Sequence, residues 1–599
     1  MLTFFYGGTG TGKSYAMMDK IKQAAKDGRK VCVIVPDQFT FEYEHMLYNH
    51  LGCALFNSGN TEVWSFSRLA ADIFRCTKAP EGMGADSTVK TAVMYKVIRL
   101  ISEREGLLFF DKQAKRASFA NTALTMLSEL IHSGVTPEIL GEILKTAPDN
   151  MRDKLTDLFL IYSEYSSELA ALGMRDILLD ARLAADMAEQ NGYFNDMCLF
   201  MDEFKSFTGD QYNMIRVMLS QCAELTVCMT SDDIGKGGFG PFTAVNETCA
   251  GLSSIAAELG KRINKVKSDD NRRYKSEELF ELSKNLLRLP SKAYNGDGGN
   301  ITLVTAPDIY GECDYICAAI CELTAADRSL RYSDIAVLSR AMNDDISVLA
   351  PHFERYNIPY YSDKKRPAGH KPLMLMVTAA LELAAEKKPS TEVLLRYAKT
   401  GLTQVSEEDI AYIENYCYTW DIDGSMWQSE FPDEKAEDIR LRLLTPINSL
   451  KKACSGKTGA QICDALRSFI GETGAEEKLL SFEGKYITEA ESAAQIRENE
   501  WLCSQLDEIF ASLEQALTEK ISLSDFREIF MLSAEKITLA APPDALDGVI
   551  AQQSDLARLT NPKIVFVMHA NDGIFPFITG ESSTFSERER EFFKKSDYD

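Results

Sequence analysis

The chain has 599 residues and a formal net charge of -24 at pH 7, with 45% hydrophobic and 26% charged residues. This length exceeds what one hydrophobic core supports and predicts roughly three or four domains, while the composition is that of an ordinary soluble globular protein. The acidic balance argues against a general electrostatic attraction to nucleic acid or to an anionic membrane, but it leaves room for a local basic channel.

The sequence also lacks the signs of export or membrane insertion. No apolar run reaches the ~18 residues that a membrane span needs, and the first predicted strand begins at residue 2, which leaves no room for a signal peptide. The 14 cysteines include no C-x-x-C pair, which fits a reducing compartment. We therefore expect a cytoplasmic protein without membrane contact.

The first predicted elements are a strand, a glycine-rich turn and a helix. The apolar run at residues 2–6 has the character of a buried strand, and the turn after it fits G-x-x-x-x-G-K-[ST]. Glycines let successive backbone N–H groups point at one anion, and the following helix adds its positive N-terminal end. We predict a P-loop that binds ATP through Gly7, Gly8, Thr9, Gly10, Thr11, Gly12, Lys13 and Ser14.

Two side chains of this P-loop have separate predicted roles. Lys13, a predicted catalytic residue, is expected to reach the β and γ phosphates, and the Ser14 hydroxyl is expected to bind Mg²⁺. The alternative is a glycine-rich turn that binds nothing. The strand before it and the helix after it disfavour that alternative.

Two loops with aromatic side chains follow. A second buried strand is predicted at residues 30–35, stopped by Pro36, and a short strand leads into a helix within residues 61–70. Both loops should leave the carboxyl edge of the sheet, where ligands of open α/β sheets bind and where aromatic rings could stack on DNA bases. Core packing is the alternative, and it is favoured for Phe66. The candidate DNA contacts here are Gln38, Phe39, Phe41, Trp64 and Phe66.

Amphipathic helices are predicted for residues 80–191, after which the strand MCLFM ends in Asp202 and Glu203. With a P-loop in the same chain, these acids predict the second half of a nucleotide site. Asp202 would hold Mg²⁺, and Glu203 would orient or deprotonate the attacking water. A solvated turn is the alternative. Residues 1–79 and 192–270 should thus form a first α/β lobe with a helical insertion at 80–191.

A polar segment at residues 271–300 is predicted to be a linker. A second α/β lobe is predicted from residues 301–372 and 533–599, with strands at ITLVTAPD, SDIAVLSR, KITLA and KIVFVMHA, and residues 373–532 should form its helical insertion. Cys313, Cys317 and Cys321 recur at helical spacing. A buried core face is favoured for them over a metal site.

The second lobe also contains a compact basic stretch, YYSDKKRPAGHKP. It could contact a phosphate backbone, although an exposed charged loop is an equal alternative. The candidate DNA contacts in this stretch are Lys364, Lys365, Arg366 and His370. The predicted fold class is therefore α/β, with two RecA-like P-loop lobes that each contain a parallel sheet flanked by helices and a mainly helical insertion.

This order of motifs resembles the superfamily 1 helicase core of the UvrD type, and within it the AddB family of helicase-nuclease subunits. The residues that carry the resemblance are the P-loop at the N-terminus, VPDQFTFEYE, VWSFSRLA, DEFKSFTGDQYNMI, IPYYSDKKRPAGHKPL and VFVMHANDGIFP. The resemblance implies binding of ATP, Mg²⁺ and single-stranded DNA in a heterodimer with an AddA-like motor-nuclease subunit. The complex would resect double-stranded DNA ends for recombinational repair and read a short hotspot sequence. A nuclease domain and an iron–sulfur cluster are expected only further along a longer chain.

Several departures from the motor pattern keep a second hypothesis open. MTSDD, residues 229–233, stands where the family couples nucleotide to DNA through a glutamine, and AQQSDLARLT, residues 551–560, replaces a glycine-rich segment. Only six residues precede the P-loop, where the family places an adenine-reading glutamine, and the sequence ends at Asp599, before the segment in which the family carries its arginine finger. The alternative is a helicase-like scaffold and DNA-binding module that binds nucleotide without translocating. An unrelated P-loop kinase or sensor ATPase would not explain a second lobe.

Overall fold

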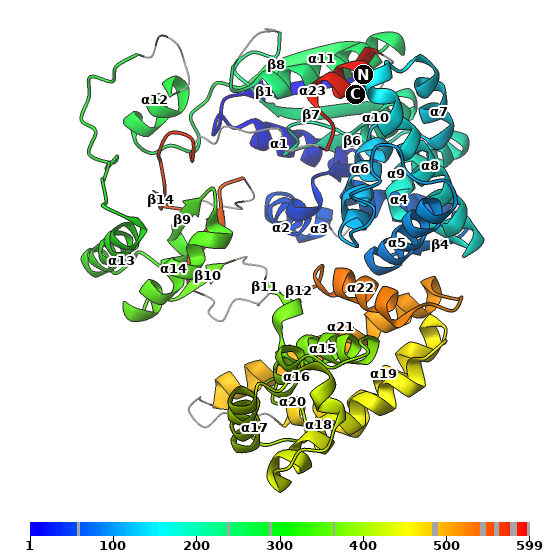
Figure 1. Cartoon of the computed structure of the whole chain (residues 1–599). Helices are drawn as coiled ribbons and strands as arrows, with labels where there is room; N and C mark the ends of the chain where they lie inside the picture. Colours follow the sequence, from blue (N-terminus) through cyan, green and yellow to red (C-terminus); the bar gives the residue numbers. More distant parts are fainter. Residues whose placement is uncertain are drawn as a thin grey trace.

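The computed structural model describes the whole chain except residues 57–59, 236–239, 287–289, 291, 363–365, 482–488, 540–546, 556, 558–561, 576–583 and 596–599. Two α/β lobes and two groups of helices are visible in Figure 1, with the first lobe at the top, the second at the left and helices at the right and bottom. No described helix is both long enough and apolar enough to cross a bilayer.

The first lobe is built on a parallel sheet with the strand order β3-β2-β6-β7-β1-β8. Its strands are β1 (Leu2–Gly7), β2 (Val31–Ile34), β3 (Thr61–Trp64), β6 (Cys198–Met201), β7 (Glu224–Thr230) and β8 (Ile263–Lys267). Only β7 separates β6 from β1, so the strand end that carries Asp202 lies near the P-loop on the same edge. This proximity follows from strand order and not from closeness in the sequence.

Both faces of this sheet are covered because its strands are apolar on both sides. Along β2, Val31 and Val33 enter one core while Cys32 and Ile34 enter the other, as the alternation of a strand requires. One face carries α1 (Lys13–Lys26), α2 (Thr40–Leu51) and α3 (Cys53–Phe56), and the other carries α4 (Phe66–Cys76), α9 (Asp180–Asn191), α10 (Gly209–Gln221) and α11 (Thr243–Glu258).

The second lobe contains a smaller parallel sheet with the order β10-β13-β9-β14. Its elements are β9 (Ile335–Ser339), β10 (Tyr360–Ser362), β13 (Val549–Gln553), β14 (Ile564–Val567), α13 (Ile309–Ala326) and α14 (Met342–Arg355). Cys313 and Cys317 are fully buried against this sheet, which confirms their prediction as core residues. The two sheets together confirm the predicted α/β fold class with two lobes.

One predicted strand of the second lobe was wrong, and another forms a strand but lies outside the lobe's sheet. Residues 301–306 form no strand, and Leu303 is 91% exposed, because no neighbouring strand in the described part of the chain supplies backbone partners there. The KITLA segment gives β12 (Thr538–Leu539), which pairs antiparallel with β11 (Arg366–Pro367) in a separate ribbon. These two strands pair with each other where the chain leaves and re-enters the lobe. Part of the predicted linker is also helical, as α12 (Glu277–Asn285).

The helices between the strands form two groups. The first contains α5 (Ser87–Arg104), α6 (Phe119–His132), α7 (Pro137–Thr146) and α8 (Asp149–Ala171), with a ribbon of β4 (Met83–Ala85) and β5 (Met174–Asp176). The second contains α15 (Pro372–Ala385), α16 (Thr391–Ala398), α17 (Glu407–Trp420), α18 (Glu434–Cys454), α19 (Gly459–Thr473), α20 (Ala475–Leu480), α21 (Glu489–Ala516) and α22 (Leu523–Ala534). A further helix, α23 (Glu587–Lys595), follows β14. The domain limits expected from the sequence stay predictions.

The two helical groups share one continuous hydrophobic core, which the sequence did not predict. That core runs from α5, α6 and α8 into α15, α21 and α22, and it includes Phe585, just before α23, and Phe593 within α23. Helix α5 packs directly against α21 and α22. The helices inserted into the two lobes therefore act as one packed body.

Candidate functional site

The P-loop folds as a compact turn between β1 and α1. Gly10 and Gly12 have φ values of 75° and 83°, a conformation that glycine adopts without strain. The Thr11 hydroxyl donates to the Gly8 carbonyl over 2.8 Å, which closes the turn on itself. Gly12 is the residue before the first turn of α1, so the free N–H groups at the start of this helix face the loop. The backbone has the form that a phosphate-binding nest requires.

Lys13 lies across this turn. Its ammonium donates to the Gly8 carbonyl over 2.9 Å, and the residue is only 8% exposed. Burial lowers the pKa of Lys13, while the nearby charges of Asp202 and Glu203 act in the opposite direction. A lysine held over the turn and beside two carboxylates is placed to contact a triphosphate and its metal ion.

Asp202 lies at the end of β6 and contacts the P-loop. The Ser14 side chain lies close enough to this carboxylate to lower the pKa of Asp202, and the carboxylate accepts the Tyr43 hydroxyl at 3.1 Å. The backbone N–H of Glu203 donates to Asp202 Oδ1 over 2.9 Å. Asp202 is 4% exposed, and burial raises its pKa although these hydrogen bonds and Lys13 oppose the rise. The structure therefore brings Ser14 and Asp202 together from opposite ends of the first lobe's sequence.

The oxygen donors of Ser14 and Asp202 suit a magnesium ion. Mg²⁺ prefers oxygen ligands and is usually held by one or two protein groups together with phosphates and waters. A hydroxyl and a buried carboxylate that lie near each other at the start of α1 match that donor set. Mg²⁺ bound here would neutralise phosphate charge. Among the described residues, no group of three or more His, Cys, Asp or Glu side chains could hold a metal ion by itself.

Glu203 follows in a strained backbone conformation, with a φ of 66°. Although the residue is exposed as a whole, burial of its carboxyl group raises its pKa to about 7, and the Asp202 charge adds to the rise. A carboxyl group that titrates near neutral pH can accept a proton from water. The geometry thus supports the predicted role of Glu203 beside the phosphates.

The sequence did not identify a segment that covers the P-loop from the other side. After β8, the Ser268 N–H donates to the Tyr6 carbonyl over 2.8 Å, and the Arg272 N–H donates to the Gly10 carbonyl over 3.0 Å. A Cβ atom on Gly12 would lie 2.9 Å from the Arg272 side chain, and one on Gly10 would lie 2.8 Å from Arg273. Two arginines therefore lie against the loop, within a segment predicted to be a linker.

Two adjacent arginines just after the strand that borders β1 were the signal that could have identified this cover. Arginine is the side chain best suited to bind phosphate oxygens, because its guanidinium presents several donors in one plane. Arg273 also lies near enough to Lys13 and Glu203 for its charge to affect the pKa of both. We add Arg272 and Arg273 to the candidate nucleotide contacts.

The predicted DNA contacts near this site differ in exposure. Phe41 is 78% exposed at the start of α2, whereas Gln38, Phe39 and Trp64 are half-buried. Phe66 is only 7% exposed, with its ring edge-on to those of Phe204 and Phe207. No face of the Phe66 ring is therefore open to a base, and of the five residues Phe41 has the most accessible ring.

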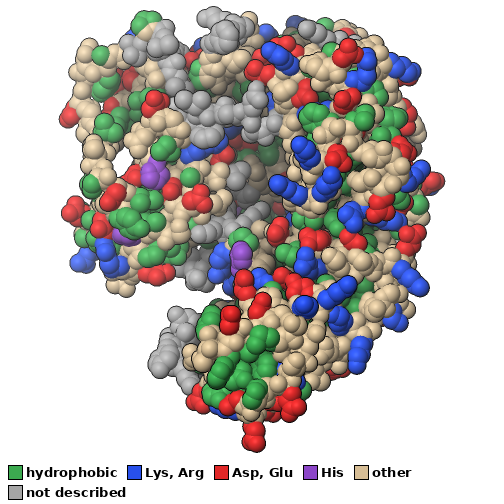
Figure 2. Space-filling model, in the orientation of Figure 1, with side chains coloured by type: hydrophobic (Ala, Val, Ile, Leu, Met, Phe, Trp, Pro, Cys, Tyr) green, Lys and Arg blue, Asp and Glu red, His purple; other side chains and the backbone are tan. Residues whose placement is uncertain are grey.

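The predicted basic stretch in the second lobe is only partly described. Lys364 and Lys365 lie outside the described residues. Arg366 is half-exposed and forms an ion pair with Glu498 over 3.0 Å, and His370 is exposed. Basic and acidic side chains are mixed over the face drawn in Figure 2, and that surface is hollowed between the lobes.

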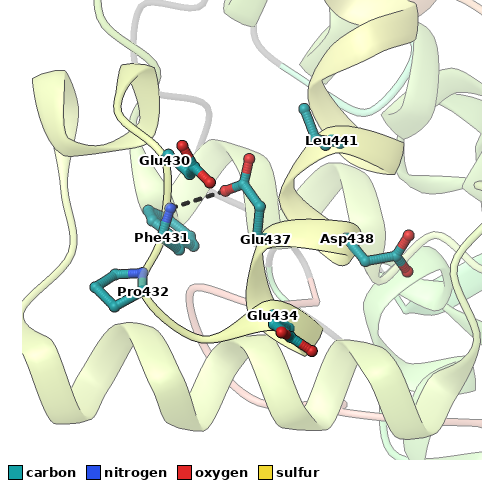
Figure 3. A pocket seen from close by; sticks show the side chains of 7 residues that line it. All are labelled: Glu430, Phe431, Pro432, Glu434, Glu437, Asp438 and Leu441. Atoms are coloured by element: carbon teal, nitrogen blue, oxygen red, sulfur yellow. Dashed lines mark hydrogen bonds between the residues drawn. The ribbon is translucent and has the colours of Figure 1, made fainter.

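A cavity of about 510 Å³ lies far from this site, beside α18 at the bottom of Figure 1. It is lined by Glu430, Phe431, Pro432, Glu434, Glu437, Asp438 and Leu441 (Figure 3). The Phe431 N–H donates to Glu437 over 2.8 Å, and Glu437 also holds Arg440. A cavity with four carboxyl groups repels phosphate, so we do not connect it with the nucleotide or with DNA.

Comparison with known proteins places this site in a family. Residues 4–283 match a sequence model described as ADDB, N-terminal, and the chain is similar over nearly its whole length to proteins named as the B subunit of an ATP-dependent helicase/deoxyribonuclease. The chain is similar to the AddB family, most specifically over residues 4–283. The match at residues 4–283 contains the P-loop, Asp202, Glu203 and both arginines. The resemblance found in the motifs is thereby confirmed.

Similarity to individual AddB relatives is moderate but extends along the chain. The chain is 27% identical to the helicase/deoxyribonuclease protein of Clostridium botulinum (strain Loch Maree / Type A3), over 99% of this chain and 54% of that protein. Identity is 27% with the protein of Clostridioides difficile (strain 630) and 28% with that of Thermoanaerobacter sp. (strain X514), in each case over 98% of this chain and 53% of the relative. The chain thus spans about half the length of these AddB proteins.

Proposed function

We propose that this chain is the ATP-binding and DNA-binding part of a helicase-nuclease subunit that works in a heterodimer with an AddA-like motor-nuclease. The observation that supports it best is the proximity of Asp202 to Ser14 and Lys13, at a P-loop whose lysine lies over the turn. The names of its relatives, which call each of them one subunit of a helicase/deoxyribonuclease, support the wider process. In this process the heterodimer binds double-stranded DNA ends, resects them for recombinational repair and reads a hotspot sequence.

The residues of the site divide the chemistry among them. The P-loop N–H groups and Lys13 bind the phosphates, and Ser14 and Asp202 hold Mg²⁺. Glu203 orients or deprotonates the attacking water, and Arg272 and Arg273 approach the same loop from the opposite side. Single-stranded DNA lies along the carboxyl edge of the first sheet, where Phe41 offers a stacking surface and Gln38 a hydrogen-bonding group.

A second function has an observation in its favour. The end of β7 and the loop after it have the sequence TSDD, residues 230–233, and Asp232 lies beside Gly8, where a nucleotide-coupling glutamine is expected of an active motor. The chain could then bind nucleotide as a scaffold and DNA reader without turnover. Lys13, Ser14, Asp202 and Glu203 are all present and in contact range, which favours turnover.

The experiment that tests the proposal is ATP turnover with and without single-stranded DNA, measured for the wild type and Lys13→Ala, alone and with the partner subunit. Stimulation by DNA that the variant loses supports the motor function. Tight ATP binding without turnover supports the scaffold. If the wild type binds neither ATP nor single-stranded DNA, both functions are wrong.

A further inference from the structure

Tyr43 connects Asp202, the predicted metal ligand, to the sheet edge where DNA is predicted to bind. It lies in the first turns of α2, two positions after the exposed Phe41, and is itself 3% exposed. Its hydroxyl donates to Asp202 Oδ2 over 3.1 Å in the interior of the lobe. Burial raises the pKa of Tyr43 well above its ordinary value, so the hydroxyl remains a donor at neutral pH. One short helix therefore carries Phe41 at the surface and a bond to Asp202 inside.

The loop that contains Asp202 and Glu203 also contacts α4, the helix that follows β3. Phe66 begins α4, and its ring centre lies 5.6 Å from that of Phe204 and 6.2 Å from that of Phe207. Phe204 directly follows Glu203 in the sequence. The loop that contains Asp202 and Glu203 is therefore held by α2 on one side and by α4 on the other.

The segments that follow β2 and β3 at the carboxyl edge of the sheet, the edge loops, are also joined to each other at the surface. The Ser67 hydroxyl bonds to the Asp37 carboxylate, and Arg68 forms an ion pair with Glu44 over 3.3 Å. A ligand that displaces one loop must therefore displace the other or break these contacts. Movement of the loop after β2 would shift Asp202 through Tyr43. Movement of the loop after β3 would shift Glu203 through Phe204.

A link between the predicted nucleotide site and the predicted DNA site is needed in this chain. The loop after β7 lacks the glutamine through which the resembled helicases connect nucleotide to DNA, and it carries TSDD in its place. A chain that binds both ligands needs some element that responds to both, because coupling requires a structural group whose arrangement each ligand changes. Tyr43 bonds to Asp202 in the predicted nucleotide site. It also lies on α2, the helix that carries the predicted DNA contact Phe41.

We propose that Tyr43 is a positioning residue that couples single-stranded DNA at the edge loops to nucleotide at the P-loop, through its hydrogen bond to Asp202. The inference rests on the proposed function, because it requires both ligands to bind. DNA that contacts α2 fixes the Tyr43 hydroxyl, which orients the Asp202 carboxylate toward the metal ion. Because binding equilibria are reciprocal, bound nucleotide must then raise the affinity for DNA by the same factor.

The test is Tyr43→Phe, which removes one oxygen and keeps the ring in the core. ATP affinity is measured without and with an oligothymidylate, and oligothymidylate affinity is measured without and with a non-hydrolysable ATP analogue and Mg²⁺. In the wild type we expect each ligand to raise the affinity for the other by about 5-fold or more, which is the usual range of allosteric coupling. In Tyr43→Phe the factor should fall to about 1, while DNA affinity without nucleotide stays unchanged.

Tyr165→Phe is the matched control, because the Tyr165 hydroxyl makes the same kind of buried bond, to Asp176 over 2.9 Å, in the first helical group. That variant should keep the wild-type coupling factor. A second variant, Phe204→Leu, tests the α4 contact and should lower the factor without removing the Tyr43 bond. Circular dichroism before each titration confirms that the variants are folded.

Coupling in Tyr43→Phe within twofold of the wild type and of Tyr165→Phe would overturn the inference, and so would a wild type that binds both ligands with no coupling. In either case the proposed function stands, since ATP and DNA still bind. Failure of the wild type to bind either ligand is a different result, and it overturns the proposed function itself. If Tyr43→Phe does not fold, the wild-type titrations still test the inference, because equal affinities with and without the other ligand overturn it.

Discussion

Tyr95 and Asp525 are separated by 430 positions, yet the Tyr95 hydroxyl donates a hydrogen bond to Asp525 Oδ1 over 2.7 Å. Tyr95 lies on α5 and Asp525 on α22, so the bond joins the helices inserted into the first lobe to those inserted into the second. The Lys536 ammonium adds a bond to the Thr91 hydroxyl over 2.5 Å. Both lobes are therefore attached to a single helical body.

We expect Tyr95→Phe to weaken the contact between the two helical groups. The Tyr95 ring is 9% exposed and stays in place in the variant, so the change removes a hydrogen bond to a charged group and costs about 1.5–3 kcal/mol. The shift is measured as a lower midpoint temperature of thermal unfolding. Tyr418→Phe is the control, because Tyr418 is 73% exposed and its hydroxyl is 3.5 Å from Glu414. Equal midpoints for both variants would contradict a stabilising contact.

Gly12→Ala should weaken ATP binding much more than Gly28→Ala. Both glycines have positive φ values, 83° and 72°, so both variants lose about 1 kcal/mol from backbone strain. A Cβ atom at Gly12 meets the Arg272 side chain at 2.9 Å, whereas one at Gly28 has nothing within 4 Å. The difference between the variants therefore isolates the crowding of the P-loop.

We expect Gly12→Ala to lose about tenfold or more in ATP affinity, measured with a fluorescent ATP analogue, because the loop and the arginine cover cannot both keep their places. Gly28→Ala should bind ATP as the wild type does. Equal affinities in the two variants would show that the cover segment moves away freely and does not shape the site.

Arg273→Ala should lower ATP turnover or affinity about tenfold. A guanidinium that binds phosphate makes charge-assisted hydrogen bonds of about 1.5–3 kcal/mol. Steady-state hydrolysis and ATP titration separate a loss of turnover from a loss of affinity. The matched control is Arg216→Ala, since Arg216 forms a surface ion pair with Glu258 away from the loop. If Arg273→Ala behaves like the control, Arg273 is not a nucleotide contact.

Phe41→Ala should lower the affinity for single-stranded DNA and leave ATP binding unchanged. Stacking of one base on an aromatic ring contributes about 1–3 kcal/mol, so the loss is about tenfold, measured by fluorescence anisotropy of an oligothymidylate. Tyr418→Ala removes an aromatic ring of similar exposure from the second helical group and should have no effect. Equal DNA affinity in both variants would place the strand elsewhere.

The attachment of α23 should weaken in acid. Burial raises the pKa of Glu589, but donors from the Ser586 backbone and hydroxyl and from Lys154 outweigh it and hold the pKa below 4.5. A depressed carboxyl pKa adds stability above the unfolded pKa of 4.5, and this stability is lost as the pH falls through the folded pKa.

Glu589→Gln should therefore unfold at a lower temperature than the wild type at pH 7. The gap between the two midpoints should narrow as the pH falls below about 4.5, because the wild type is then protonated as well. Thermal unfolding of both proteins across this range checks the sign. A gap that stays constant with pH would mean that the charge of Glu589 contributes nothing.

The sequence by itself determined the P-loop and the two parallel sheets. A phosphate nest is made from contiguous backbone, so the strand, the glycines and the helix of residues 2–26 predict it without reference to the rest of the chain. Buried parallel strands are short apolar runs, which is why most of them could be predicted locally. The apolar run at residues 301–306 was wrongly predicted as a strand, because an apolar sequence does not by itself supply a pairing partner.

Only the tertiary structure decided which distant groups meet. The contact of Tyr43 with Asp202, the position of Arg272 and Arg273 over the P-loop and the bond between Tyr95 and Asp525 all depend on strand order and helix packing. None of these contacts has a sequence period or a fixed spacing. They arise because burial of apolar surface brings whole elements together, and the polar groups that lie at each interface then have to satisfy one another.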